Sequence, residues 1–560
     1  MRRKILLIGA TGVFGNRLAL HLIRWSDIEL VVTSRSMAKA EVAVNHLRLI
    51  VPGAKLSAIA FDTRADIKSQ LANIKPFCVI DCSGPFQESG HRAAKSVLAM
   101  GSHMIDLADA RVYLRDYKLK LNETAQRNAV TGLAGASSTP ALSSIVVNQL
   151  TQNWQRVDAI DICITPGGRS EVGKSVLEAI LSYVGKCIPT WNEGKMVSTR
   201  AWLNSKLIKI PELGQRRIAP VDTFDAEFLG HRHNVTSRVR FSAGLESTIE
   251  QLGLGFIAFI VKTGLMQNIN TFIPILLNAR NFTRLFTGDT GAMMVVVTGL
   301  NEEGILSTAR WVLLAKYDHG PFVPVLPAAA ALRALINESL DPGAGLALGQ
   351  LDLRMIENEM KPYSISTQSD VAHLHSGLFP TVLGANKYEQ LPSILRNFHD
   401  ADGAPVWVGE ANVDASKNYL LAVIASFLGF PKAGKKVPVC VSVERQVDQD
   451  NGDLILETWT RNFDGRRFSS ELGCQRDGGF VEKFGPLTFN IGLDVKENCL
   501  VMPVIGWKFA FIPLPKFLAP RSQASESIDV HGRFQFDVKL TLPLLGLFAH
   551  YRGWLVPKGI

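Results

Sequence analysis

The chain has 560 residues, with a hydrophobic fraction of 47%, a charged fraction of 20% and a net charge of +9. The length predicts three or four domains, and the composition is that of a globular protein, not a disordered or low-complexity one. The basic residues form only short clusters such as Arg216-Arg217, which argues against nucleic-acid binding. An anionic small molecule or a membrane surface suits this mild positive charge better.

The seven cysteines include no CxxC pair. An odd number of cysteines without such pairs argues against a disulfide framework and against structural zinc. We therefore expect reduced thiols, no metal site and a cytoplasmic location.

The N-terminus has three basic residues, Arg2, Arg3 and Lys4, before an apolar run, as an export signal does. The apolar run Ile5–Ile8 is four residues long, whereas the apolar core of a signal needs about 7–15 residues. We therefore expect no exported leader. The apolar stretch Leu252–Val261 has ten residues, too few to span a membrane, and fits either a core helix or a helix on a membrane surface.

The stretch GATGVFG, residues 9–15, follows a strand predicted at Ile5–Ile8 and precedes apolar residues at helical spacing. In such a unit the glycines allow a sharp turn, a close approach of the backbone to a pyrophosphate and close helix packing. The helix N-terminus adds free N–H groups. This context predicts a dinucleotide-binding turn. The residues expected to contact the dinucleotide are Gly9, Thr11, Gly12, Val13, Phe14 and Gly15.

The second predicted strand begins at Ile28 and ends in Ser34, Arg35 and Ser36, and Lys39 follows one helical turn later. NAD-binding folds carry an acidic residue here, which holds the ribose 2′-hydroxyl and would repel a 2′-phosphate. An arginine can instead bind a phosphate through two hydrogen bonds. The sequence therefore favours NADP over NAD, and the alternative is that Arg35 is simply solvated.

The next strands also end in polar turns. Asp62 ends the third strand, where it can accept a hydrogen bond from the adenine amino group. The fourth strand, residues 77–81, leads into a Gly-Pro turn at a strand's carboxyl end, where ligands bind in open α/β sheets. Strands are also predicted within 102–109 and 129–137, and their alternation with helices predicts a parallel α/β sheet. The turn residues expected at the cofactor are Cys82, Ser83, Gly84, Pro85 and Phe86.

Asp106 and Asp109, at the end of the fifth strand, are the candidate catalytic residues. The cofactor performs hydride transfer, so the protein needs only one proton donor or acceptor near the substrate. Cys82 and Ser137 are further candidates at strand ends. Two carboxyl groups three residues apart would not titrate independently if both were buried. The alternative for the aspartates is helix capping or a link to Arg111.

The motifs GATGVFG, SRS, FD, VIDCSGPFQESG, HMIDLADA and GASSTPALSS, in this order, resemble the saccharopine dehydrogenase-like oxidoreductases. The resemblance covers about the first 150 residues and extends more weakly to about residue 360. It implies a Rossmann domain that binds NADP, lined by residues 9–15, 34–36 and 82–86, and then an α+β domain. The arginines of the middle segment form no motif for a substrate with several carboxylates. An apolar carbonyl, imine or enoyl substrate is therefore favoured over saccharopine.

Residues 151–370 are predicted to form an α+β domain for substrate binding or dimerisation. A helix is expected at 174–185 and a hairpin at 291–318. The apolar stretch 252–286 is expected either to wall an apolar pocket or to pack in the core. Its aromatic residues are Phe256, Phe259, Phe272, Phe282 and Phe286.

Residues 371–560 are rich in predicted strands. We expect a curved antiparallel sheet that wraps a helix in the shape of a half-open cup. The motifs WTRNFDGRRFSS, EKFGPLTF, GRFQFDV and LFAHYRGWL resemble a bacterial domain of unknown function. Arg461 and Glu482 are predicted polar anchors of an apolar-ligand cup or, alternatively, a solvated ion pair on a strand. The residues of interest here are His399, Trp459, Arg461, Phe463, Glu482 and Tyr551.

Together these features predict an NADP-dependent oxidoreductase with three domains, 1–150, 151–370 and 371–560. The alternative is a non-catalytic protein that senses NADP or binds lipid. The expected partner is a hydrophobic small molecule, and a homodimer and a peripheral contact with a membrane stay open.

Overall fold

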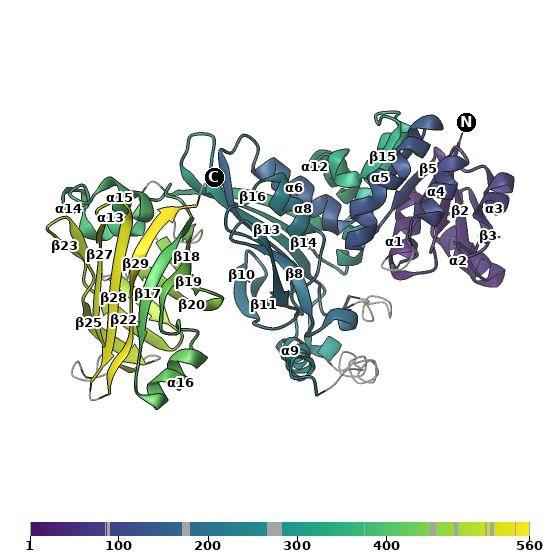
Figure 1. Cartoon of the computed structure of the whole chain (residues 1–560). Helices are drawn as coiled ribbons and strands as arrows, with labels where there is room; N and C mark the ends of the chain where they lie inside the picture. The colour runs from purple at the N-terminus through teal and green to yellow at the C-terminus, as the bar shows by residue number, and fades with distance from the viewer. Residues whose placement is uncertain are drawn as a thin grey trace.

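The computed structural model describes residues 2–84, 86, 90–170, 180–265, 283–374, 376–447, 455–474, 480–509, 512–513, 515, 520–543 and 545–558. These residues form three β-sheets with their covering helices. Figure 1 shows the N-terminal sheet at one end of the molecule, the C-terminal sheet at the other and the middle sheet between them.

The first sheet is parallel, and its strands run in the order β15-β6-β5-β4-β1-β2-β3. This order, which reverses between β1 and β4, is that of dinucleotide-binding folds, so the predicted α/β fold is confirmed. The strands are short apolar runs buried on both faces. They are β1 (Arg3–Ile8), β2 (Ile28–Ser34), β3 (Leu56–Ala60), β4 (Cys78–Asp81), β5 (His103–Asp106), β6 (Thr131–Ala134) and β15 (Gly343–Leu346). The helices are α1 (Val13–Leu22), α2 (Met37–Ile50), α3 (Ile67–Ile74), α4 (Arg92–Ala99), α5 (Arg111–Arg127) and α6 (Ser143–Leu150), with the π-helical turn η1 (Ser138–Leu142).

The chain returns to this sheet after the middle unit. β15 pairs with β6, and helix α11 (Leu326–Ile336) packs its buried alanines against α1 and β5. Arg333 on α11 forms an ion pair of 2.8 Å with Asp27. The predicted boundary at residue 150 does not include this return, because the sequence Gly-Ala-Gly-Leu of β15 carries no strand pattern.

The middle sheet is mixed and runs in the order β10-β11-β12-β7-β13-β14-β16, with the hairpin β8–β9 attached to β12. β13 and β14 form the predicted hairpin. The helix predicted at 174–185 lies mainly outside the described residues, of which 180–183 are helical. The strands are β7 (Arg156–Thr165), β8 (Cys187–Asn192), β9 (Lys195–Arg200), β10 (Lys206–Ile210), β11 (Gly214–Pro220), β12 (Arg238–Ala243), β13 (Gly291–Leu300), β14 (Leu306–Ala315) and β16 (Ile365–Leu374). The helices are α8 (Asp225–Arg232), α9 (Thr248–Lys262) and α12 (Leu353–Met360), with the 3-10 turns η3 (Arg284–Phe286), η4 (Gly320–Val325) and η5 (Ala347–Gly349).

The C-terminal sheet is antiparallel and runs in the order β23-β24-β27-β28-β29-β17-β18-β19-β20-β21-β22-β25-β26. It curls until β25 and β27 approach within 8 Å between Cα atoms, so its two edges nearly meet (Figure 1). The predicted curved antiparallel sheet is confirmed. The strands are β17 (Val406–Ala415), β18 (Gly434–Val447), β19 (Ile455–Phe463), β20 (Arg466–Cys474), β21 (Phe480–Phe484), β22 (Leu487–Ile491), β23 (Asp494–Lys496), β24 (Cys499–Val501), β25 (Val504–Phe509), β26 (Ile512–Pro513), β27 (Arg521–Ile528), β28 (Phe534–Leu542) and β29 (Gly546–Pro557).

The helices of this unit cap the curled sheet and do not run through it. Helices α13 (Leu378–Leu383), α14 (Ala385–Tyr388) and α15 (Ser393–His399) lie at one end, and α16 (Tyr419–Phe427) lies at the other (Figure 1). The expectation of a sheet wrapped around a helix is corrected in this respect. At 1.5 Å per residue, helices of this length are too short to traverse the curl.

Charged contacts dock the C-terminal unit on the middle one. The Arg238 guanidinium pairs with Asp161 at 2.6 Å and also with Glu444 of β18. Lys558 Nζ donates a hydrogen bond of 2.6 Å to the Glu193 carbonyl oxygen. The third sheet is therefore held by side chains as well as by chain continuity.

Candidate functional site

The glycine turn between β1 and α1 is tightly packed. Gly9 has a φ of +75°, and a Cβ there would lie 2.9 Å from backbone atoms of Cys82 and Ser83. A Cβ on Gly15 would lie 2.1 Å from the Gly9 carbonyl oxygen. Both positions therefore require glycine.

Helix α1 begins directly at this turn with its first N–H groups uncapped by a side chain. Its N-cap is Gly12, whose own N–H donates to the Gly9 carbonyl oxygen at 2.9 Å. Thr11 and Gly12 are exposed, and Val13 and Phe14 are half-buried in the first turn of the helix. The free N–H groups and the positive end of the helix dipole suit a phosphate group.

The residues predicted to bind the 2′-phosphate lie at the carboxyl end of β2. Arg35, Ser36 and Lys39 are exposed, and Ser36 donates its N–H to Ser34 Oγ at 3.4 Å where α2 begins. Lys39 and Thr11 line one open groove between α2 and the glycine turn. The structure therefore brings the predicted basic residues to the same edge of the sheet as the turn.

Arg64 is a further basic residue at this edge that the sequence analysis missed. Its guanidinium and N–H bond the Asp62 carboxylate at 3.0–3.2 Å. The hydrogen bond from Arg64 lowers the pKa of Asp62, and the charge of Arg35 lowers it further. Arg35 and Arg64 thus both stabilise the charged form of the Asp62 carboxylate, which lies just beyond the ends of β2 and β3. The sequence signal that could have identified Arg64 was a basic residue two positions after an aspartate at the end of a strand. The predicted contact of Asp62 with adenine stays a prediction.

A buried carboxylate holds the turn after β4. Asp81 accepts hydrogen bonds from the Ser83 N–H at 2.8 Å and the Ser83 hydroxyl at 2.6 Å. Burial raises the pKa of Asp81. Sequence reasoning did not single out Asp81, although an acid at the end of an apolar strand is a signal. Of the predicted turn residues, Ser83 and Gly84 are exposed, Cys82 is half-buried, Phe86 is buried, and Pro85 lies outside the described residues.

Asp106 is completely buried at the end of β5. Its carboxylate accepts hydrogen bonds from the N–H groups of Ala108 and Gly135 at 3.0 Å each and from the Tyr113 hydroxyl at 2.8 Å. Burial raises the pKa of Asp106 to about 7. Asp106 therefore ties the ends of β5 and β6 together and offers no surface to a substrate, whereas Asp109 is exposed. Catalytic roles for both stay predictions, and the geometry favours Asp109.

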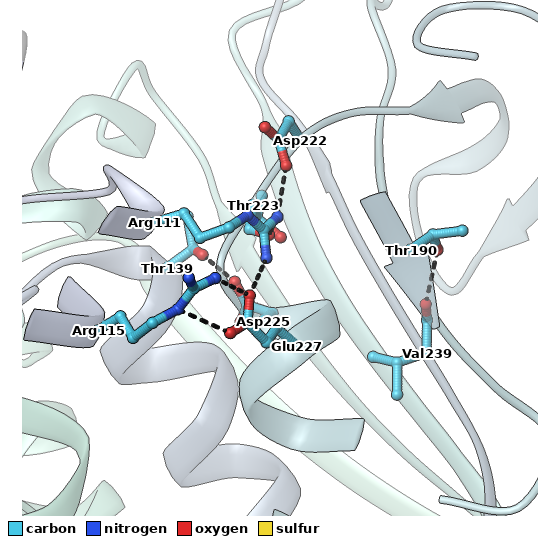
Figure 2. Close-up of polar contacts among 9 residues, drawn as sticks. All are labelled: Arg111, Arg115, Thr139, Thr190, Asp222, Thr223, Asp225, Glu227 and Val239. Atoms are coloured by element: carbon cyan, nitrogen blue, oxygen red, sulfur yellow. Dashed lines mark hydrogen bonds and ion pairs between the residues drawn. The ribbon is translucent and has the colours of Figure 1, made fainter. Parts of the chain in front are cut away.

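Figure 2 shows the contact between α5 of the first unit and the residues at and before α8 of the middle one. Arg111 pairs with Asp222 at 2.6 Å and with Glu227 at 2.9 Å, and Arg115 pairs with the same Glu227 at 2.9 Å. Arg111 thus joins two units, which differs from its predicted link to the aspartates. The ion pairs fix the middle unit beside the edge of the first sheet.

The aromatic residues of the stretch 252–286 include three in the described part of the chain. Helix α9 buries one face, with Leu254 and Ile257, and exposes the other. Packing of the three described rings in the core, one of the two predicted alternatives, is wrong, because more than half of each residue is exposed. The exposed rings are Phe256, Phe259 and Phe286, and Phe272 and Phe282 lie outside the described residues.

The residues singled out in the C-terminal segment come together at one cavity inside the curled sheet. His399 lies next to this cavity, with its Nε2 atom 2.5 Å from Oε2 of the cavity-lining Glu526. The cup is favoured over a solvated ion pair, because the predicted anchors Arg461 and Glu482 line this cavity and their side chains are 15% and 25% exposed. The predicted residues that line the cavity are Trp459, Arg461, Phe463, Glu482 and Tyr551.

Two further features were sought in the described ranges. No helix there combines the length and apolar character that crossing a membrane needs. No group of three or more His, Cys, Asp or Glu residues there is placed to hold a metal ion.

A family model described as a domain of unknown function (DUF4166) matches residues 391–555, which confirms the resemblance predicted for the C-terminal segment. Saccharopine dehydrogenase (L-Glu forming) from Saccharomyces cerevisiae is 13% identical, with a TM-score of 0.47, over 66% of this chain and 99% of that one. Amine dehydrogenase from Mycobacterium smegmatis is 10% identical, with a TM-score of 0.35, over 63% of this chain and 96% of that one. An engineered D-amino acid dehydrogenase bound to NADP⁺ is 13% identical, with a TM-score of 0.32, over 65% of this chain and 100% of that one.

These solved structures include the type of protein that the N-terminal motifs resemble. At such low identity and TM-score, however, the similarities carry no argument about cofactor or substrate. Those questions depend on the residues of this chain.

Proposed function

We propose that this protein is an oxidoreductase that uses NADP(H) and acts on an apolar carbonyl, imine or enoyl substrate. The glycine turn at the start of α1 carries the proposal. A Cβ on Gly9 or Gly15 would meet backbone atoms at 2.9 or 2.1 Å, so the turn is a cradle of bare backbone. Such a cradle fits a pyrophosphate, which must approach the backbone closely.

The preference for NADP(H) is supported by the charges beside the cradle. Arg35, Lys39 and Arg64 are exposed at the ends of β2 and β3. The nearby acid Asp62 is paired with Arg64, so it does not present an unpaired negative charge to a 2′-phosphate. Arginine binds phosphate through two parallel N–H groups, which favours the phosphorylated cofactor.

NADP(H), when bound, supplies or accepts the hydride. The N–H groups of the first turn of α1 would hold the pyrophosphate, and Arg35 and Lys39 would hold the 2′-phosphate. Ser83 and Gly84 border the carboxyl end of β4, where ligands of such sheets bind. Asp109 is the exposed acid that donates or accepts the proton of the substrate.

The ion pairs of the middle unit support an apolar substrate. Arg216 pairs with Glu246 at 3.3 Å and Arg238 with Asp161 at 2.6 Å. These two arginines of the middle segment are therefore already paired with acids. A substrate such as saccharopine would need unpaired cations to bind its charges.

The test is NADPH oxidation by the full chain with a panel of long-chain ketones, imines and enoyl thioesters. At least one class is expected to be reduced. Asp109→Asn should lower kcat about 100-fold and leave NADPH affinity unchanged, whereas Glu123→Gln, another exposed acid nearby on α5, should change neither. Tight binding of NADPH without oxidation by any compound would instead favour the non-catalytic, NADP-sensing alternative.

A further inference from the structure

The curled C-terminal sheet lines a partly open cavity of about 310 Å³. Side chains of alternate residues line it, such as Trp459 and Phe463 on β19 and Phe534 and Phe536 on β28, because successive strand residues point to opposite faces. A mostly apolar cavity of this size is within the range that holds a small ligand.

Helices contribute to the lining at both ends of the cavity. Phe398 of α15 lines one end, and Ile424 and Leu428 of α16 line the other. Figure 1 shows these helices at opposite ends of the curl, with the middle sheet between this unit and the dinucleotide-binding sheet. The cavity is therefore a site separate from the proposed hydride-transfer site.

Two ion pairs interrupt the apolar lining, that of Glu526 with the neighbouring His399 and that of Arg461 with Glu482. Arg461 and Glu482 lie 3.6 Å apart, and their side chains are 15% and 25% exposed. Arg461 Nη1 donates to Ser470 Oγ at 2.9 Å, and its guanidinium lies 5.2 Å from the centre of the Trp459 ring. These contacts hold the guanidinium at a fixed place in the wall.

Tyr551 is next to this pair. Burial raises the pKa of Tyr551 to about 12, and the charges of Arg461 and Glu482 act on it in opposite directions. Its hydroxyl therefore stays protonated, and among the described residues it has no hydrogen-bond partner. The polar patch thus offers an N–H donor, a carboxylate acceptor and a hydroxyl that can do both.

The charge balance of this patch selects the ligand's polar group. A carboxylate would be attracted by Arg461 but repelled by Glu482, and burying its charge costs free energy. A hydroxyl or carbonyl oxygen can accept from Arg461 without that repulsion, and a hydroxyl can also donate to Glu482. A neutral group therefore fits better than an anion.

We propose that this cavity binds a molecule with an apolar body and one neutral hydroxyl or carbonyl group, which Arg461 and Glu482 hold. The site does not depend on the dinucleotide, so it goes beyond the oxidoreductase activity.

The test uses the full chain with Nile red, a neutral apolar probe, and competition by 1-decanol or decanoate. Nile red is expected to bind, and 1-decanol should displace it at a concentration at least about 10-fold lower than decanoate. Val538→Trp, which fills the cavity, should abolish Nile red binding. Equal Nile red binding by a folded Val538→Trp protein, no binding by the unaltered chain, or stronger displacement by decanoate would each overturn the proposal.

Arg461→Met tests the polar anchor without filling the cavity. It should weaken the binding of 1-decanol about 10-fold, as expected for one hydrogen bond to a charged group. Arg552→Met is the matched control, because Arg552 is exposed on the outer face next to Tyr551. Equal effects of the two substitutions on 1-decanol would remove Arg461 from the site.

A second inference comes from the outer face of α16. Tyr419 and Phe427 are 84% and 90% exposed, Leu420 and Val423 are also exposed, and Leu421 is buried. Exposed lysines flank this apolar face in the sequence, and binding to a membrane surface combines burial of apolar area with electrostatic attraction to anionic lipid. The flanking residues are Lys417, Lys432, Lys435 and Lys436.

We infer that α16 docks on an anionic lipid surface. The same helix walls the cavity through Ile424 and Leu428, so a lipid surface under α16 would adjoin the apolar interior. The acid nearest in sequence to the start of α16 is Asp414. Its Oδ2 atom lies 3.7 Å from His550 Nδ1 and 3.9 Å from Arg552 Nη2, and these contacts limit the repulsion between Asp414 and anionic lipid.

Co-sedimentation with vesicles tests the inference. The chain should bind vesicles of phosphatidylcholine with phosphatidylglycerol and not vesicles of phosphatidylcholine alone. Leu420→Ser with Phe427→Ser should reduce binding at least about 10-fold, whereas Leu119→Ser, at an exposed leucine of α5, should not. Unchanged binding, or a dimer in size-exclusion chromatography that the double substitution splits, would contradict docking on lipid.

Discussion

The dinucleotide cradle and the C-terminal cavity are built in opposite ways. The cradle is an open sheet edge where bare backbone and exposed charges such as Arg35 would face the proposed dinucleotide. The cavity is lined mostly by apolar side chains, with the charged pairs Arg461–Glu482 and His399–Glu526 at its wall. From this difference we expect the cradle to lose dinucleotide binding when a single methyl group is added to one of its glycines. The cavity should lose ligand binding when its interior is filled or when its charged side chains are removed.

The largest effect is expected from Gly15→Ala. A Cβ 2.1 Å from the Gly9 carbonyl oxygen must push α1 away from β1. NADPH affinity should fall at least about 1,000-fold, or about 4 kcal/mol, in calorimetric titrations. Gly53→Ala, where a Cβ meets nothing within 4 Å, is the control. Nile red binding should be equal in both variants, and its loss in Gly15→Ala would show that the two sites are not independent.

Asp106→Asn should change the pH dependence of stability in the first unit. Burial raises the pKa of Asp106 to about 7 in the folded chain, against about 3.9 when unfolded. The folded state therefore binds this proton more tightly, and the contribution to stability falls as pH rises from about 4 to 7, by roughly 4 kcal/mol. Urea unfolding across this range should show a weaker pH dependence for the variant. An identical pH dependence would contradict the burial argument.

Glu526→Ala should destabilise the C-terminal unit. The side chains of His399 and Glu526 are almost completely buried, and His399 Nε2 lies 2.5 Å from Glu526 Oε2. Removal of one partner leaves the other buried and unpaired, which costs about 3 kcal/mol in the free energy of unfolding measured with urea. The double variant His399→Phe, Glu526→Leu should recover most of this loss, because apolar side chains need no partner. No recovery in the double variant would point to a structural role for the pair beyond charge burial.

Arg35→Asp should have the smallest effect and the most selective one. NADPH binding should weaken about 30-fold, or about 2 kcal/mol, because an acid repels the 2′-phosphate. NADH binding should be unchanged or tighter. Arg127→Asp, at an exposed arginine of α5, is the control and should leave both affinities unchanged. Equal weakening of NADPH and NADH by Arg35→Asp would exclude a contact with the 2′-phosphate.

The features of the first site that are local in sequence could be predicted. The glycines of residues 9–15 and the residues that end β2 follow from a strand, a turn and a helix in direct succession. The role of Asp106 could not be predicted, because its hydrogen-bond donors Gly135 and Tyr113 come from other elements of the fold. The return of β15 to β6 could not be predicted either, because more than two hundred residues separate these strands.

The same limit applies to the C-terminal unit. Side chains alternate between the two faces of a strand, and this alternation along β19 and β21 is enough to place Arg461 and Glu482 on the inner face of the sheet. The approach of β25 to β27, which turns a curved sheet into a partly open cavity, depends on contacts across the whole sheet. The pairing of His399 with Glu526 joins residues 127 positions apart and has no local signal.

The central claim is that the N-terminal edge binds the phosphorylated dinucleotide. The most direct test is titration of the full chain with NADPH and with NADH, followed by the fluorescence of the nicotinamide ring. We predict that NADPH binds at least about 10-fold more tightly than NADH. Equal or tighter binding of NADH, or no binding of either, would contradict the claim.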